Sequence, residues 1–169
     1  MRCYFDILHV NVPTQTKALY DIIRLVRPLY KVLEAAVALE LAETGISVPQ
    51  RALLEQLQDQ GPLTVPAIGR RLILPRQFVQ KTANELLDAG LLEKRDNAAH
   101  KRSALLALTP EGRAVIGRVL AREAAVMRPM AKALEAGDVE TTRATLLAVI
   151  EAFQAHNAER KRQEEGETS

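Results

Sequence analysis

The chain has 169 residues, of which 47% are hydrophobic and 26% are charged, and its formal net charge is +2. These proportions are typical of a folded globular protein, and they exclude a wholly disordered chain, a collagen-like repeat and a disulfide-rich scaffold. The longest apolar stretches are far shorter than the roughly 18 to 20 residues that a membrane span requires. Charged and polar side chains interrupt the first twelve residues, which excludes a secretory signal, so we expect a cytoplasmic protein.

Positive charge is concentrated in the middle of the chain. Residues 66–102 hold eight basic and four acidic side chains, whereas residues 1–65 and 103–169 each carry a formal charge of −1. A basic segment between two nearly neutral ones indicates a folded unit with one face for an anionic partner. Chance clustering on a solvated surface is the alternative that the charge alone leaves open.

The first part of the chain is predicted to form an arm and a long helix. Residues 1–13 alternate loosely in polarity, as expected of an extended arm. A helix over residues 14–46 then begins with Thr14 as its N-cap, kinks or splits at Pro28 and ends near Gly45. Its apolar positions recur at spacings of mainly three and four residues: Leu19, Ile22, Ile23, Val26, Leu29, Leu33, Ala36 and Val37.

Three shorter helices are predicted next. Ser47 and Gln50 have the spacing of a capping box, which indicates a second helix that ends before Gly61. Thr64 is expected to cap a third helix, and after a short turn Pro75 opens a fourth. The side of the fourth helix that we expect to be buried consists of Val79, Ala83, Leu86 and Leu87. Its opposite side is basic or amide-bearing throughout: Arg76, Gln77, Gln80, Lys81 and Asn84.

The second half is predicted to form a β-hairpin and two more helices. Residues 91–95 and 103–108 have strand-like patterns on either side of a polar connection. Thr109, which a proline follows, marks the start of a helix. A last helix begins near Asp138, and the charged tail at residues 159–169 is predicted to be frayed. The last helix is expected to bury Leu146, Leu147, Ile150 and Phe153.

The middle segment has the features that a protein needs to bind duplex DNA. Two helices joined by a tight turn can place the second helix in the major groove. On that helix Arg76 and Lys81 suit guanine edges or phosphates, and the three amide side chains suit adenine. Lys101 and Arg102 near the hairpin tip can reach the adjacent minor groove or its phosphates. Which of these side chains contact bases stays open at this point.

Several fragments resemble the MarR-type winged helix-turn-helix transcriptional regulators, over a stretch from Leu19 to about Phe153. Residues 61–65 (GPLTV) are similar to the family's lead into its third helix. Residues 90–95 (GLLEKR) are similar to its recognition-helix exit and first wing strand, and residues 108–113 (LTPEGR) to its strand-to-helix junction. The order and spacing of these fragments together carry the resemblance.

The resemblance implies a mainly α-helical fold with a small β wing. The winged helix-turn-helix domain would occupy residues 47–109, with dimerisation helices at residues 14–46 and 110–158 on either side of it. It further implies a homodimer that binds a pseudo-palindromic operator as a ligand-responsive regulator, which we expect to be a repressor. A small aromatic molecule is the effector that this family commonly admits.

Eight positions take over the DNA-binding role that the resemblance implies. They are Arg76, Gln77, Gln80, Lys81 and Asn84 on the helix, and Arg95, Lys101 and Arg102 on the wing.

Three positions depart from the family's pattern. His100 stands where an aspartate usually precedes the wing-tip arginine by two residues, so a contact that supports the wing is missing. Pro75 replaces the usual Ser or Thr cap of the recognition helix, which leaves early backbone amides without a side-chain acceptor. Ile73 replaces the usual turn glycine, so we expect the turn to avoid a positive φ there.

Other chemical roles have weaker support. Cys3, with tyrosines in the chain, raises the idea of a redox sensor, but its place in the arm favours a passive thiol. The three histidines are too far apart for a metal motif, and no nucleophile, phosphate loop or cofactor motif is found. We therefore expect no cofactor and no enzymatic activity. The alternative function is a winged-helix scaffold that dimerises but binds another protein instead of DNA.

Overall fold

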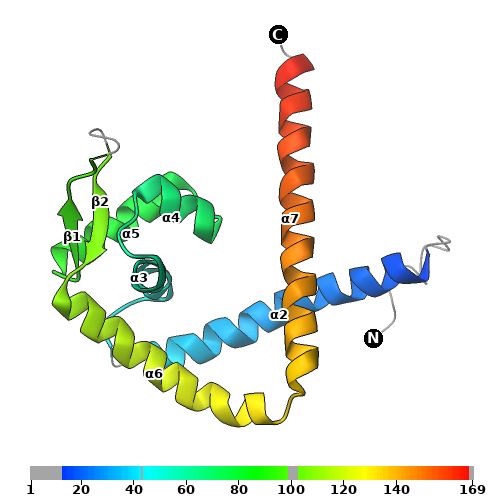
Figure 1. Ribbon diagram of the computed structural model, residues 1–169, viewed down its shortest axis with the longest axis horizontal. Coiled ribbons are helices and arrows are strands. Elements are labelled where there is room, and N and C mark those ends of the chain that lie inside the picture. Colours follow the sequence, from blue (N-terminus) through cyan, green and yellow to red (C-terminus); the bar gives the residue numbers. More distant parts are fainter. Residues whose placement is uncertain (1–12, 43, 99–102, 168–169) are drawn as a thin grey trace. The chain divides into compact units, whose positions relative to one another are not determined.

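The computed structural model describes residues 13–42, 44–98 and 103–167, and Figure 1 shows its helices and strands in chain order. The elements are α2 (Thr14–Leu41), α3 (Val48–Gln60), α4 (Val65–Leu72), α5 (Arg76–Asp88), β1 (Leu92–Arg95), β2 (Leu105–Leu108), α6 (Pro110–Lys132) and α7 (Ala136–Glu167). They form two compact units that divide after Glu123, within α6. The predicted class, mainly α-helical with a small β wing, is confirmed. None of the described helices is long and apolar enough to span a membrane.

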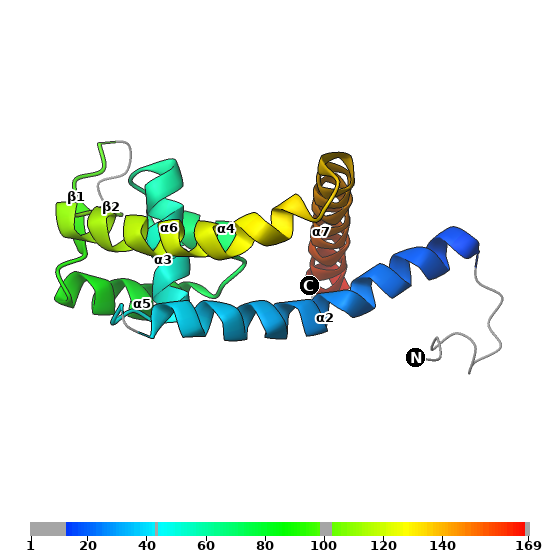
Figure 2. The same ribbon diagram turned by 90° about the horizontal axis from the view of Figure 1, so that it is seen from below.

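The first long helix, α2, differs from its prediction at both ends. Its N-cap is Pro13 and not Thr14, because the extended backbone of that proline (ψ 142°) already starts the helix. The helix continues through Pro28 and is not split there. Figure 2 shows that it changes direction near its middle, as a missing backbone hydrogen bond allows. The helix ends at Leu41, and Gly45 then has the predicted left-handed conformation, with φ +72°.

Residues 44–123 form a winged lobe around one hydrophobic core. The most completely buried side chains come from each of its helices: Leu53, Leu54, Ile68, Val79, Leu86, Ile116 and Val119. Removing these side chains from water is the main stabilising contribution to the lobe. Two predicted helix starts are confirmed by hydrogen bonds. The backbone N–H of Ser47 donates to Oε1 of Gln50 at 2.9 Å, and Oγ1 of Thr64 accepts from the N–H of Ala67 at 3.3 Å.

The wing is a two-stranded antiparallel sheet with a short third partner. β1 and β2 pair so that Leu92 lies opposite Leu108. Leu63 then forms an isolated bridge to Leu106: its N–H donates to the Leu106 carbonyl at 3.1 Å, and the Leu106 N–H donates back at 2.8 Å. Sequence reasoning missed this partner because a single bridging residue has no alternating pattern. The bridge attaches the segment between α3 and α4 to the wing.

The junction between β2 and α6 explains the sequence of residues 108–113. The Thr109 hydroxyl accepts from the N–H of Gly112 at 3.0 Å and donates to the carbonyl of Gly90 at 2.9 Å, so the predicted helix start is confirmed. A Cβ atom on Gly112 would lie 2.1 Å from the carbonyl oxygen of Leu91. Only glycine therefore allows α6 to approach this closely. The junction fixes the exit of α5 against the beginning of α6.

The second long helix, α7, is longer than predicted. It begins at Ala136, two residues before the expected start, and continues to Glu167, so residues 159–167 are helical and not frayed. Arg160 and Glu164 lie 3.7 Å apart, and such pairs four residues apart support a helix even where few apolar contacts do.

The apolar stripe of α7 is not buried within one chain, contrary to the prediction. Leu147, Ile150 and Phe153 keep between 45% and 51% of their surface exposed, and Leu146 is only partly covered. The C-terminal unit contains one long helix and the end of another, which is too little structure to cover the stripe. The same is true of one side of α2, where large apolar side chains are more than half exposed: Leu25, Leu29, Val32, Leu33 and Leu39.

Candidate nucleic-acid interface

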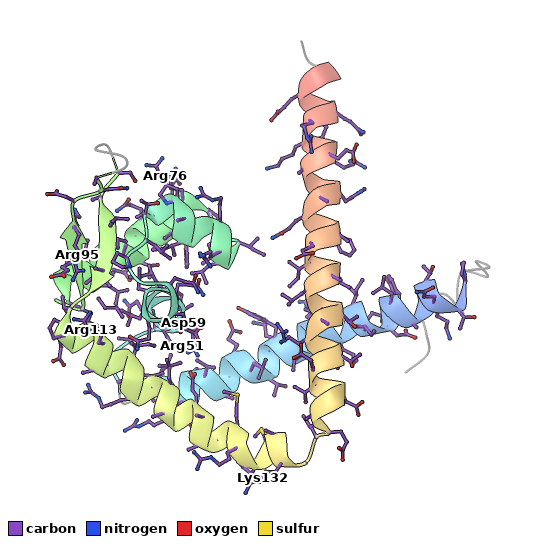
Figure 3. The ribbon with its side chains drawn as sticks, viewed as in Figure 1. Arg51, Asp59, Arg76, Arg95, Arg113 and Lys132 are labelled. Atoms are coloured by element: carbon purple, nitrogen blue, oxygen red, sulfur yellow. The ribbon has the colours of Figure 1, made fainter. Side chains whose placement is uncertain are left out.

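The helix α5 has one buried and one open side, as predicted. Val79, Ala83 and Leu86 are almost completely buried, and Thr82 is buried with its hydroxyl bonded to the carbonyl of Phe78 at 3.0 Å. The side chains on the open side are all exposed: Arg76, Gln77, Gln80, Lys81 and Asn84. Figure 3 shows Arg76 projecting from the surface of the lobe. The structure thus brings the five helix residues that the sequence singled out onto one accessible surface, which we call the α5 surface.

Two amides of the α5 surface are held together. Nε2 of Gln80 donates to Oδ1 of Asn84 at 3.0 Å, one helical turn further on. Oε1 of Gln80 can still accept a hydrogen bond, and Nδ2 of Asn84 can still donate one. Because the two amides are bonded to each other, these two groups lie close together. Side chains that are ordered before binding lose less conformational entropy when they bind. The pair can therefore present a donor and an acceptor together at the edge of a base.

Charge is divided along α5. The cations Arg76 and Lys81 lie in its N-terminal half, and the carboxylates Glu85 and Asp88 lie in its C-terminal half. Oε2 of Glu85 accepts a hydrogen bond from Nε2 of Gln50 at 3.0 Å, which ties this carboxylate to α3. Since phosphates repel carboxylates, the N-terminal half of α5 is the part that an anionic duplex can approach most closely.

The turn before α5 differs from its prediction at Ile73. Ile73 has φ +56° and ψ +42°, the left-handed conformation that the absence of glycine was expected to prevent. The turn needs it because the N–H of Leu74 donates back to the carbonyl of Gly69 at 2.9 Å, which closes the end of α4. For an isoleucine this conformation costs about 1 to 2 kcal/mol. The expectation for Pro75 is confirmed: it holds the N-cap position, and among the described residues no side chain caps α5.

On the wing, the structure places one of the three predicted residues. Arg95 is half-exposed, and Figure 3 shows it on the outside of β1. Its guanidinium donates to Oε1 of Glu93 through Nε at 2.8 Å and through Nη2 at 2.6 Å, so part of its charge is balanced by a neighbour. Beyond the last strand pair, on the side of the hairpin tip, Nδ2 of Asn97 donates to the carbonyl of Ser103 at 2.9 Å. Lys101, Arg102, His100 and Cys3 lie outside the described residues.

Comparisons with known proteins decide the family. The sequence model of the MarR family matches residues 44–103. A protein of Mycobacterium tuberculosis described as uncharacterized is 38% identical over 114 residues, which are 68% of this chain and 79% of the relative. The crystal structure of SP03579, a MarR family transcription regulator, is 32% identical with a TM-score of 0.71, over 83% of this chain and 93% of that protein. The chain belongs to the MarR family.

A further similar structure contains a ligand. PcaV, a transcriptional regulator from Streptomyces coelicolor, is 27% identical with a TM-score of 0.59, over 73% of this chain and 90% of that protein. It was solved in complex with its natural ligand.

For this MarR family chain, no described group of three or more His, Cys, Asp or Glu side chains could hold a metal ion.

Sequence reasoning missed an ion-pair cluster that fixes α6 to the winged lobe. Arg51 on α3 donates to both oxygens of Glu123 on α6, with Nε to Oε1 at 2.7 Å, and to Glu55 at 2.7 Å. Figure 3 shows Arg51 between α3 and α6. The hydrogen bonds with Glu123 raise the pKa of the guanidinium more than its partial burial lowers it, so Arg51 stays charged. The spacing of Arg51 and Glu55 is visible in the sequence, but the distant Glu123 is not.

Proposed function

We propose that the chain is a ligand-responsive transcriptional regulator, acting as a repressor, that binds a pseudo-palindromic operator as a homodimer. The observation that carries the proposal is the division of α5 into a buried, mainly apolar side and an exposed side of cations and amides. Such a helix can enter the major groove without exposing its core. In this account residues 47–109 bind DNA, and the chain acts by binding and not by catalysis.

Each side chain of the α5 surface has a role that its chemistry supports. Arg76 and Lys81 bind guanine edges or phosphates, and Gln77 binds adenine. Gln80 and Asn84 act as one ordered pair on a neighbouring base. On the wing, Arg95, Lys101 and Arg102 bind phosphates or the adjacent minor groove. The balance between Arg95 and Glu93 means that Arg95 contributes less than a free cation would.

The second copy is supported by the exposed apolar sides of α2 and α7. Leu19, Ile22, Val26, Leu29 and Leu33 alternate at three and four residues, which is the spacing of a seam between helices. An exposed seam of this length in a soluble protein marks an interaction surface. We assign it, with the stripe of α7, to the partner subunit, so residues 14–46 and 110–158 are the dimerisation helices.

An effector site is supported by a shallow hollow at the end of α2. It measures about 390 Å³ and is lined mainly by apolar groups: Ala38, Leu41, Ala42, Gly45, Ile46, Ser47 and Val48. This volume suits a small aromatic molecule. Ala38→Phe would fill the hollow. We expect this variant to bind DNA normally but to be released less by aromatic acids such as salicylate than the unchanged chain.

The test of DNA binding is fluorescence anisotropy on the duplex upstream of the chain's own gene, over a range of salt concentrations. Arg76→Ala should reduce the slope of log affinity against log salt by about one, as for a lost phosphate contact. Gln80→Ala should change the preferred sequence and leave the slope unchanged. Arg160→Ala is the charge-matched control, because this exposed arginine lies beyond the proposed dimerisation residues and already pairs with Glu164. A dimer without salt-sensitive DNA binding would instead establish the scaffold alternative.

A further inference from the structure

The described part of the winged lobe exposes two large apolar side chains, and both lie near the N-terminal end of α5. Among the described residues from 44 to 123, the only exposed large hydrophobic residues are Ile73, at 64%, and Phe78, at 43%. All others in the described chain lie on α2 or beyond Glu123. Single exposed apolar residues are ordinary on protein surfaces. In the lobe, however, the two residues both lie at one end of α5, whereas single exposed residues would be scattered over the whole surface.

Phe78 is not needed for the core of the lobe. The buried side of α5 is filled by Val79, Thr82, Ala83 and Leu86. Residues three and four positions apart are neighbours on a helix, so Phe78 lies beside Lys81 on one side and Thr82 on the other. It therefore stands at the border between the α5 surface and the buried side. Its ring is available to whatever the α5 surface binds.

The charge along α5 places Phe78 in the half that approaches DNA. Arg76 and Lys81 lie on either side of it in the sequence, whereas Glu85 and Asp88 follow in the other half. A phenyl ring cannot form the hydrogen bonds that most groups on base edges in the major groove require. The 5-methyl group of thymine is the apolar group on those edges.

We propose that Phe78 contacts the 5-methyl group of one thymine in each half-site and so determines specificity at that position. The inference rests on the proposed DNA-binding function and adds a residue that the sequence analysis did not include. Ile73 adds apolar surface at the same end of α5. The test uses Phe78, because a change at Ile73 would also alter its left-handed backbone.

The experiment compares thymine with deoxyuridine, which differs only in lacking the methyl group. A duplex is first selected by the full-length chain from a random library, and its thymines are then replaced one at a time. At one thymine in each half-site, replacement should weaken binding about fourfold, as expected for one buried methyl group. Replacement in both half-sites should weaken it roughly fifteenfold. For Phe78→Ala, the affinities for the thymine duplex and for the duplex with one deoxyuridine should differ by less than about 1.5-fold.

Gln77→Ala is the matched control, because it removes a side chain from the same helical turn. Its affinity should fall, but the ratio between thymine and deoxyuridine should stay near fourfold. The inference is overturned if no thymine is sensitive to its methyl group, or if Phe78→Ala keeps the full ratio. Failure to select any sequence would overturn the proposed function itself, so the two failures are distinguishable. Circular dichroism of Phe78→Ala and Gln77→Ala, compared with the unchanged chain, checks that both variants are folded.

Discussion

The winged lobe and the two long helices α2 and α7 treat their apolar side chains in opposite ways. In the lobe, Leu54, Ile68 and Ile116 have no accessible surface, and several helices contribute to one core. On α2 and α7, side chains such as Leu29 and Phe153 are about half exposed. The lobe therefore buries its apolar side chains in a core of its own, which Leu41 at the end of α2 completes, whereas the exposed stripes of the long helices require another surface. In our proposal the lobe contacts the DNA, and the long helices bind the partner subunit.

The largest expected effect is on association through α2. Leu29→Asp places a carboxylate in the proposed seam of each subunit, where it would lose its hydration. We expect the dimer to weaken at least a thousandfold, about 4 kcal/mol, in sedimentation experiments over a range of concentrations. Lys31→Asp, on the opposite side of the helix, should leave the dimer intact. A dimer that tolerates Leu29→Asp would contradict the assignment of α2.

The next largest effect concerns the lobe alone. Gly112→Ala would place a Cβ atom 2.1 Å from the Leu91 carbonyl oxygen, so α6 must move away from the exit of α5. We expect the free energy of unfolding in urea to fall by about 3 kcal/mol. Gly117→Ala is the control, because a Cβ atom there meets nothing within 4 Å and alanine favours a helix. Equal destabilisation by both variants would show that the close approach is unimportant.

A smaller effect tests how α6 is held against α3 within the lobe. Glu123→Ala leaves the partly buried Arg51 with Glu55 as its remaining acidic partner, so we expect a loss of about 2 kcal/mol in stability. Glu140→Ala removes the partner of an exposed arginine and should have no measurable effect. Both are read from urea denaturation. No difference between them would mean that the Arg51 cluster does not hold α6.

The smallest effect is a gain in stability. Ile73→Asn puts a residue that tolerates positive φ at the turn before α5, and we expect the lobe to become more stable by about 1 kcal/mol. The thermal midpoint of unfolding should rise accordingly. A fall in the midpoint would show that the exposed isoleucine side chain stabilises the turn by more than its backbone conformation costs.

Local signals in the sequence predicted much of the fold and could not predict the rest. The caps at Thr64 and Thr109 were correct because a cap depends on residues within one turn of the helix. The open side of α5 was correct because helical periodicity is also local. The prediction for Ile73 was wrong because the turn between α4 and α5 requires a positive φ there, although an isoleucine disfavours it. The Leu63 bridge and the Arg51 cluster join distant segments, which one sequence does not reveal.

The most direct test of the account is the sequence that the full-length chain selects from a random duplex library. The account predicts enrichment of a pseudo-palindrome whose half-sites have centres about 10 base pairs apart, as two α5 helices in successive major grooves require. It also predicts that Gln80→Ala selects a different sequence with the same spacing. Enrichment of a single unpaired site, or no enrichment by a chain that dimerises, would contradict it.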